Sequence, residues 1–381
     1  CLLVLLAISA CSIFGDKDEP VEVPAKLTDI ASPEVTGQAA WSNSVGDGGD
    51  DINGFRLSMD ELALYAADAD GRISAFSLET GKNVWQVKTD LRLISGPFLL
   101  GDYLLLGTLD GEVVALHRDN GSRAWRAAAT SEVLASPVGE QGVVVARSAD
   151  GKLVGLSLAD GQRLWTFDRN VPTLTLRGVS EPIIHDGLVF AGLDNGKLAA
   201  LDLRTGALKW EQAISLPSGR SELERIVDLD AQILIVNNIV YAVSYGGNMM
   251  ALDISNGRPI WRKDLASYTG LTHDGNRIYV TDRKGHVWAL DRDNGGELWV
   301  NKTIEYRGLS APVIHGNYVL VADQEGYLHW LSQADGEIVG RKKLGGQAFT
   351  DARALNNRVF LMNEKGRINA LDAVPLATAS K

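Results

Sequence analysis

Residues 111–125 read Gly-Glu-Val-Val-Ala-Leu-His-Arg-Asp-Asn-Gly-Ser-Arg-Ala-Trp, and this pattern recurs along the chain. In each complete copy a glycine opens the pattern, apolar residues follow, and a tryptophan lies fourteen positions after the opening glycine. Complete copies open at Gly71, Gly111, Gly151, Gly196, Gly247 and Gly285. A seventh copy opens at Gly326 but has Gly340 in place of the tryptophan, and an eighth, opening at Gly366, stops before its tryptophan. Repeats of this length indicate units that bury their apolar surface against their neighbours.

Each repeat of about 40 residues contains short alternating apolar runs, which are typical of β-strands. In the second copy we expect strands at residues 97–100, 103–108, 112–117 and 122–127. Asp-Gly and Asn-Gly pairs between these runs supply the positive φ angles that tight hairpins need. The pattern therefore predicts an all-β fold: an eight-bladed β-propeller of four-stranded antiparallel blades over residues 37–376.

The tryptophans are explained by packing between blades, because a ring at a fixed place on each outer strand would bury roughly 150–250 Å² against the next blade. The eighth copy supplies only three strands. Residues 41–45, Trp-Ser-Asn-Ser-Val, resemble the fourth strand of the first copy, which begins at Trp85. We therefore predict that the N-terminal strand completes the eighth blade and closes the ring, which removes an exposed sheet edge.

The start of the chain has the pattern of an export signal. Residues 2–10 are apolar and end at Cys11, a run too short to span a bilayer. The stretch Ile8-Ser9-Ala10-Cys11 resembles the bacterial lipoprotein signal, in which the cysteine becomes the lipidated first residue. We expect residues 1–10 to be a signal peptide lacking its basic start, and residues 11–36 to be the lipidated cysteine and a flexible tether. Residues 377–381 would be a C-terminal tail, and Ser12 favours the outer membrane in this resemblance.

Neither nucleic-acid binding nor catalysis is indicated. The formal net charge is −11 and the basic residues are scattered, which does not favour a phosphate-binding surface. The repeat resembles that of pyrroloquinoline quinone (PQQ) alcohol dehydrogenases, whose sites use Ca²⁺, a catalytic Asp and often an adjacent cysteine pair. No adjacent cysteine pair exists here, and the six histidines lack metal-ligand spacing. We predict no catalytic residues, cofactor or metal, and interpret recurring aspartates as turn initiators: Asp202, Asp253, Asp291 and Asp372.

Two connections between repeats are longer than the early ones. The first two connections take 12 residues from the tryptophan to the next inner strand, whereas those after Trp165 and Trp210 take 17 and 23. Because connections between blades lie on one face of a propeller, these adjacent enlarged loops are candidates for a binding surface.

Their composition leaves two readings open. The first loop contains residues 171–178, Val-Pro-Thr-Leu-Thr-Leu-Arg-Gly, and the second carries acidic residues that include Asp228-Leu229-Asp230. Leucines beside an arginine have the composition of a protein interface, and the acids would suit a basic partner surface. Alternatively, the leucines pack beneath the loops and the charges are solvated.

As a whole the chain resembles the BamB family, the lipoproteins of the outer-membrane β-barrel assembly machinery (BAM complex). The resemblance rests on the lipoprotein cysteine, the acidic tether, the Trp41 segment, the PQQ-like blades and the two loops. It implies a non-enzymatic scaffold that binds a periplasmic POTRA domain of BamA and assists the folding and insertion of outer-membrane β-barrel proteins. The positions that match the family's binding loops are Leu174, Leu176, Arg177, Asp228 and Asp230.

The resemblance also suggests contact with unfolded β-barrel clients through an exposed strand edge. Two alternatives remain at this point: a PQQ-dependent quinoprotein dehydrogenase-like enzyme, and a propeller scaffold of another envelope complex.

Overall fold

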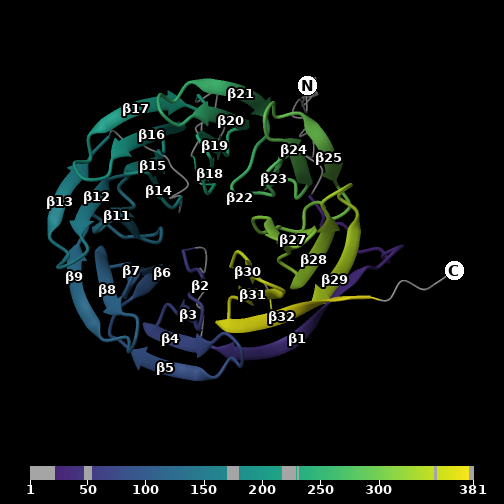
Figure 1. The fold of residues 1–381 in the computed structure, drawn as a ribbon, viewed down its shortest axis with the longest axis horizontal. Coiled ribbons are helices and arrows are strands. Elements are labelled where there is room, and N and C mark those ends of the chain that lie inside the picture. Colours follow the sequence, from purple (N-terminus) through teal and green to yellow (C-terminus); the bar gives the residue numbers. More distant parts are fainter. Residues whose placement is uncertain are drawn as a thin grey trace, which may run out of the picture.

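Eight four-stranded antiparallel sheets form a closed ring around a central axis (Figure 1). The computed structural model describes residues 22–46, 54–169, 180–216, 229, 231–346 and 350–376. The regular elements within these ranges are all strands, and none of these residues forms a helix long and apolar enough to cross a bilayer. The predicted all-β, eight-bladed propeller is confirmed.

Each blade carries its first strand beside the axis and its fourth strand at the rim (Figure 1). The strands of blades 1 and 2 are β2 (Ser58–Met59), β3 (Ala63–Ala67), β4 (Arg72–Ser77), β5 (Asn83–Lys88), β6 (Leu93–Leu100), β7 (Tyr103–Thr108), β8 (Glu112–His117) and β9 (Arg123–Ala128). Those of blades 3 and 4 are β10 (Val138–Glu140), β11 (Val143–Arg147), β12 (Leu153–Ser157), β13 (Arg163–Phe167), β14 (Ile183–His185), β15 (Leu188–Gly192), β16 (Lys197–Asp202) and β17 (Leu208–Ala213).

The second half of the ring repeats this order. Blades 5 and 6 contain β18 (Leu234–Val236), β19 (Ile239–Val243), β20 (Asn248–Asp253), β21 (Pro259–Asp264), β22 (Leu271–His273), β23 (Arg277–Thr281), β24 (Val287–Asp291) and β25 (Glu297–Asn301). Blade 7 contains β26 (Val313–His315), β27 (Tyr318–Ala322), β28 (Tyr327–Ser332) and β29 (Ile338–Lys343). Blade 8 combines β30 (Arg353–Leu355), β31 (Arg358–Met362) and β32 (Arg367–Pro375) with β1 (Val35–Ser44).

The apolar core lies between the blades. The second and third strands are almost continuously buried, because a neighbouring blade covers each of their faces, whereas fourth strands such as β9 alternate between exposed and buried positions. One cluster joins Leu105 and Val113 of blade 2 to Val144 and Leu156 of blade 3.

In every blade except blade 7, a tryptophan on the fourth strand packs against the next blade. Trp125 lies opposite Ala115, and its indole Nε1 donates a 2.8 Å hydrogen bond to the carbonyl of Leu158 in blade 3. Its ring covers Gly161, where a Cβ atom would lie 2.7 Å from Cε3 of Trp125. Gly161 also has a φ of +74°, so the ring contact and the backbone both require glycine there. The same contacts join Trp41 to Gly81, Trp85 to Gly121, Trp165 to Gly206, Trp210 to Gly257, Trp261 to Gly295, and Trp299 to Gly336.

Blade 7 makes a similar ring-on-glycine contact with the large and small residues exchanged, but the buried Trp330 Nε1 has no hydrogen-bond partner among the described residues. Trp330 on the third strand lies opposite Gly340 on the fourth, where other blades have a small residue opposite tryptophan. Trp330 is fully buried, and its ring lies against Gly37 of β1, where a Cβ would be 2.9 Å from Cη2. A Cβ at Gly340 would lie 2.7 Å from Cγ1 of Val35. The missing tryptophan of the seventh repeat therefore makes room for the N-terminal strand.

The N-terminal strand completes the eighth blade, as predicted. β1 pairs antiparallel with β32 and brings Trp41 opposite Ala370. Trp85 lies opposite Ala75 in blade 1 in the same way. Since the fourth strand of blade 8 comes from the other end of the chain, β32 continues without a turn.

The prediction that Asp372 initiates a turn is therefore wrong. Its carboxylate instead accepts hydrogen bonds from Arg358 Nε (2.7 Å) and Nη2 (3.0 Å). The other three aspartates do initiate turns, since each accepts a hydrogen bond from the amide of the residue two positions later.

The two faces of the ring carry different loops. The connections between blades lie beside the turns between second and third strands: the amide of Ala129, after β9, bonds the carbonyl of Gly111, and the amide of Ile214, after β17, bonds that of Gly196. We call this the connection face. The turns between first and second strands and between third and fourth strands form the opposite face. There the amide of Leu78 donates to the carbonyl of Leu62, and the amide of Arg118 donates to that of Asp102.

Residues 22–34 run along blade 7 before β1 begins. Arg307 Nη1 and Arg341 Nη1 donate hydrogen bonds of 2.9 Å to the carbonyls of Ala25 and Thr28, and Leu27 packs on the cluster between blades 6 and 7. This stretch belongs to the predicted tether, and its described part makes defined contacts with the ring. The predicted domain boundaries at residues 10, 36 and 376 stay predictions, and Cys11 lies outside the described residues.

A buried histidine network lies beneath that segment. His329 is fully buried; its Nε2 donates to Asp323 (2.9 Å), and its Nδ1 accepts from Arg341 Nε (3.3 Å). Arg307 donates to the same carboxylate at 2.7 Å. Burial lowers the pKa of His329, and an unprotonated Nδ1 is what the bond from Arg341 requires.

We predict that Trp125→Ala destabilises the ring by about 3–5 kcal/mol, since it removes a buried ring and an interblade hydrogen bond. Urea unfolding measures this, with Val84→Ala on the exposed surface of β5 as the control. Gly161→Ala should also destabilise, through the clash with Trp125 and the left-handed φ. An unchanged unfolding midpoint for Trp125→Ala would contradict the claim that this contact between blades stabilises the ring.

We also predict that His329→Gln flattens the pH dependence of stability between pH 7 and 5.5. The folded pKa of His329 lies below its unfolded value of about 6.5, so its contribution is complete above that pH and is lost as pH falls through the folded pKa. The slopes should differ by no more than about 1.4 kcal/mol per pH unit. His315, whose pKa burial also lowers, is present in both proteins and cancels in the comparison. Parallel slopes in urea unfolding would refute the prediction.

Candidate partner-binding face

The described ends of the two enlarged connections lie on the connection face. One leaves β13 and enters β14, and the other leaves β17 and enters β18, so they flank blade 4 on both sides (Figure 1). The predicted site residues themselves lie outside the described residues: Leu174, Leu176, Arg177, Asp228 and Asp230. The structure describes the base from which both loops rise.

Ion pairs cross the base of the first connection. Just before the connection, Arg169 lies 3.7 Å from Glu211 of β17, and Lys197 of β16 donates to the same carboxylate at 2.6 Å. Deeper in the ring, Arg147 at the end of β11 pairs with Asp194, and both side chains are buried. These contacts tie blade 3 to blade 4 on either side of the loop.

A further ion pair joins two blades that are not neighbours in the ring. Arg56, just before β2, pairs with Glu181, which ends the first connection, so that blade 1 is bound directly to blade 4. The Arg56 guanidinium also lies 5.4 Å from the centre of the Phe98 ring. Asp351 and Arg353 of blade 8 interact electrostatically with this pair.

The repeat pattern did not predict a role for these residues. One sequence feature could have indicated the ion pair. Arg56 and Glu181 occupy the repeat position at which the second and third repeats have the uncharged Gly96 and Ser136.

The second connection is held by a buried leucine. Leu229 is 1% exposed and lies against Gly192, where a Cβ would be 2.7 Å from the Leu229 Cβ. At the other end of the loop, Ser215 is buried and its hydroxyl bonds Asn248 at 3.2 Å, while Leu216 is exposed. Leu229 separates Asp228 from Asp230 in the sequence, so an internal anchor stands between the two predicted acidic contact residues. The alternation Asp228-Leu229-Asp230, an apolar residue between two charged ones, could have indicated from the sequence that Leu229 is buried.

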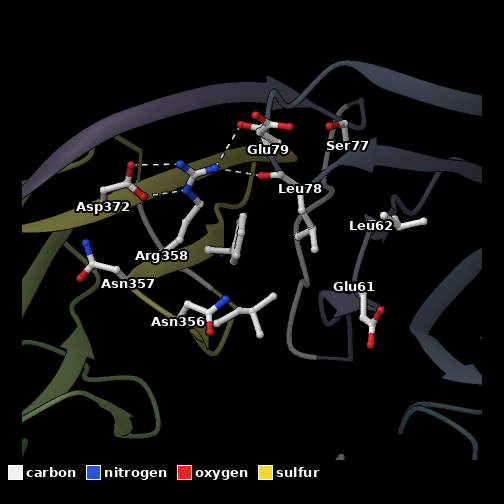
Figure 2. A pocket seen from close by; sticks show the side chains of 11 residues that line it. Glu61, Leu62, Ser77, Leu78, Glu79, Asn356, Asn357, Arg358 and Asp372 are labelled. Carbon is white, nitrogen blue, oxygen red and sulfur yellow. Dashed lines mark hydrogen bonds and ion pairs between the residues drawn. The ribbon is translucent and has the colours of Figure 1, made fainter.

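The opposite face has a cavity of about 470 Å³ at the junction of blades 8 and 1. In Figure 2, Arg358 donates hydrogen bonds to the Asp372 carboxylate and to the backbone carbonyls of Leu78 and Glu79. The guanidinium is thus occupied in joining the two blades. Among the described residues, no three His, Cys, Asp or Glu side chains gather as a metal site.

Eight blades joined by aromatic contacts, with two enlarged connections beside blade 4, define a propeller of the PQQ-like repeat class. The family model described as "Outer membrane protein assembly factor BamB" matches residues 69–301 and 295–377. The chain belongs to the BamB family.

Curated relatives and solved structures agree with this assignment. The chain is 46% identical over 346 residues to the outer membrane protein assembly factor BamB of Pseudomonas aeruginosa, covering 90% of both chains. It is 32% identical over 382 residues to the Escherichia coli protein of that name, covering 97% of both. The crystal structure of BamB from Moraxella catarrhalis is similar with a TM-score of 0.81 and 26% identity, over 88% of this chain and 99% of that one.

A quinohemoprotein alcohol dehydrogenase from Comamonas testosteroni has a TM-score of 0.67 at 12% identity, over 88% of this chain and 76% of that one. This second likeness concerns the fold alone. The relatives that share sequence with this chain are named as assembly factors.

We predict that the pair Arg56–Glu181 contributes about 1–2 kcal/mol of coupling to the stability of the ring in a double-mutant cycle. Both side chains are 17% exposed, so their attraction is screened less than in a surface pair. The control is Arg92–Asp110, where the side chains are 64% and 49% exposed and coupling should be close to zero. Equal coupling in the two cycles would show that the pair between blades 1 and 4 has no special role.

Proposed function

We propose that this protein is a non-enzymatic scaffold of the outer-membrane β-barrel assembly machinery, which binds a periplasmic POTRA domain of BamA through the two enlarged connections. The observation that carries the proposal is the adjacency of these two connections on a braced face, in a chain of the BamB family. Curated relatives of this chain are named outer membrane protein assembly factors.

The bracing supports a binding role for the loops. A loop on a rigid base loses less conformational entropy when it binds than one on a mobile base. Leu174 and Leu176 would supply an apolar anchor, Arg177 a forked cation, and Asp228 and Asp230 a pair of acids next to the buried Leu229. A surface that combines apolar side chains with both positive and negative charges favours one partner in one orientation.

The proposed location is the periplasmic face of the outer membrane, through lipid on Cys11. Eleven steps of chain separate Cys11 from Glu22, the first described residue, and can span at most about 40 Å. The contacts of Ala25 and Thr28 with blade 7 would then hold the ring close to the membrane, where it raises the local concentration of BamA and of arriving β-barrel proteins.

We predict that Leu174→Ala/Arg177→Ala weakens binding to the purified POTRA domains of BamA at least tenfold, because interface leucines and arginines of this kind contribute about 1–2 kcal/mol or more. Binding is measured by biolayer interferometry in a Cys11→Ser background. The matched control is Leu164→Ala/Arg123→Ala, which removes an exposed leucine and an exposed arginine from fourth strands. Wild-type affinity in the folded loop variant, or no binding by the wild type, would refute the proposal.

A further inference from the structure

An aromatic and basic cluster lies on the connection face one blade beyond the second enlarged connection. Tyr245 and Arg283 are in the turns between second and third strands of blades 5 and 6, and Tyr268 is in the connection between β21 and β22. The second enlarged connection enters blade 5 through β18. The cluster therefore continues the surface that the proposed function assigns to the partner.

Arg283 is held in place by an aromatic ring. Its guanidinium carbon lies 4.2 Å from the centre of the Tyr245 ring, a cation–π geometry. Its amide donates a 3.1 Å hydrogen bond to the carbonyl of Ala266, which fixes the turn against the neighbouring connection. The guanidinium makes no ion pair with any residue in the described ranges, and Lys284 beside it is also exposed.

Tyr268 presents an exposed ring on a rigid backbone. The side chain is 45% exposed, although the residues on both sides are hydrogen-bonded to Thr281. The hydroxyl of Ser267 donates to the Thr281 carbonyl at 2.7 Å, and the hydroxyl of Thr269 lies 2.6 Å from that of Thr281. An exposed aromatic ring on a segment that is already ordered costs less backbone entropy on binding, and exposed tyrosines of this kind are typical of energetically important interface residues.

The charge of the cluster indicates what it contacts. The chain has a formal net charge of −11, and several arginines elsewhere on the ring, among them Arg92, Arg147 and Arg307, are paired with carboxylates. Arg283 is instead positioned by a neutral ring, and its guanidinium pairs with no carboxylate of the described residues. A carboxylate of a partner, next to an apolar side chain that covers the tyrosines, complements this arrangement.

We infer that Tyr245, Tyr268 and Arg283 form a third contact with the same partner domain, and receive an acidic residue flanked by an apolar one. This inference rests on the proposed function. It extends the interface from the loops beside blade 4 to the turns of blades 5 and 6.

The test measures binding to the purified POTRA domains of BamA by biolayer interferometry at 50 and 300 mM salt, in the Cys11→Ser background. Tyr268→Ala/Arg283→Glu should weaken binding at least tenfold at 50 mM salt, and by a smaller factor at 300 mM because salt screens the reversed charge. Arg283→Lys, which keeps the charge but loses the planar stacking, should lie in between.

The matched control is Ile260→Ala/Arg258→Glu, which changes an exposed apolar side chain and reverses an exposed arginine elsewhere on blade 5. It should bind like the wild type. A thermal melt verifies folding, and Arg283→Gln replaces the double variant if that protein unfolds.

Two results would overturn the inference. If the Leu174/Arg177 variant loses binding while the folded Tyr268/Arg283 variant keeps wild-type affinity at both salt concentrations, the third contact is refuted and the proposed function stands. If the wild type does not bind, the proposed function fails and this inference fails with it.

Discussion

The ring depends on one repeated contact, a tryptophan of one blade lying on a glycine of the next. The indole adds a hydrogen bond to a backbone carbonyl, and the glycine provides both the space for the ring and the positive φ of its turn. Because each contact joins two successive blades, an isolated blade would leave its tryptophan without a partner. The eight blades therefore form one cooperative unit rather than a chain of independent sheets.

The exceptions in the repeat follow from closing the ring. Blade 8 takes its fourth strand from the N-terminus, so it has no turn glycine between its third and fourth strands to receive a ring from blade 7. Blade 7 instead places Trp330 on its third strand, against Gly37 of β1, and Gly340 leaves room for Val35. The altered seventh copy and the incomplete eighth thus both result from the junction of blades 7 and 8. At the junction of blades 8 and 1, Arg358 bonds both Asp372 and the carbonyl of Leu78 (Figure 2).

A rigid ring allows its connections to differ. Ion pairs that link blades 1, 3 and 4 lie at the ends of the first enlarged connection, and the buried Leu229 belongs to the second. The same face continues to the Tyr245–Arg283 stack and the exposed Tyr268. The residues proposed to bind the partner thus belong to the connection face, while the opposite face carries the shorter turns that complete the hairpins.

The sequence by itself determined the blade count, the four-stranded blades, the closing strand and the position of the enlarged loops. All of these follow from a local pattern repeated in register: a glycine, an apolar alternation and a tryptophan at constant spacing. Only the tertiary structure decided that Arg56 pairs with Glu181, that Trp330 packs on Gly37 where the seventh repeat has no fourth-strand tryptophan, and that the Arg283 guanidinium lies over the Tyr245 ring. These pairs join residues from different blades, and no local pattern specifies which side chains the closure of the ring will bring together.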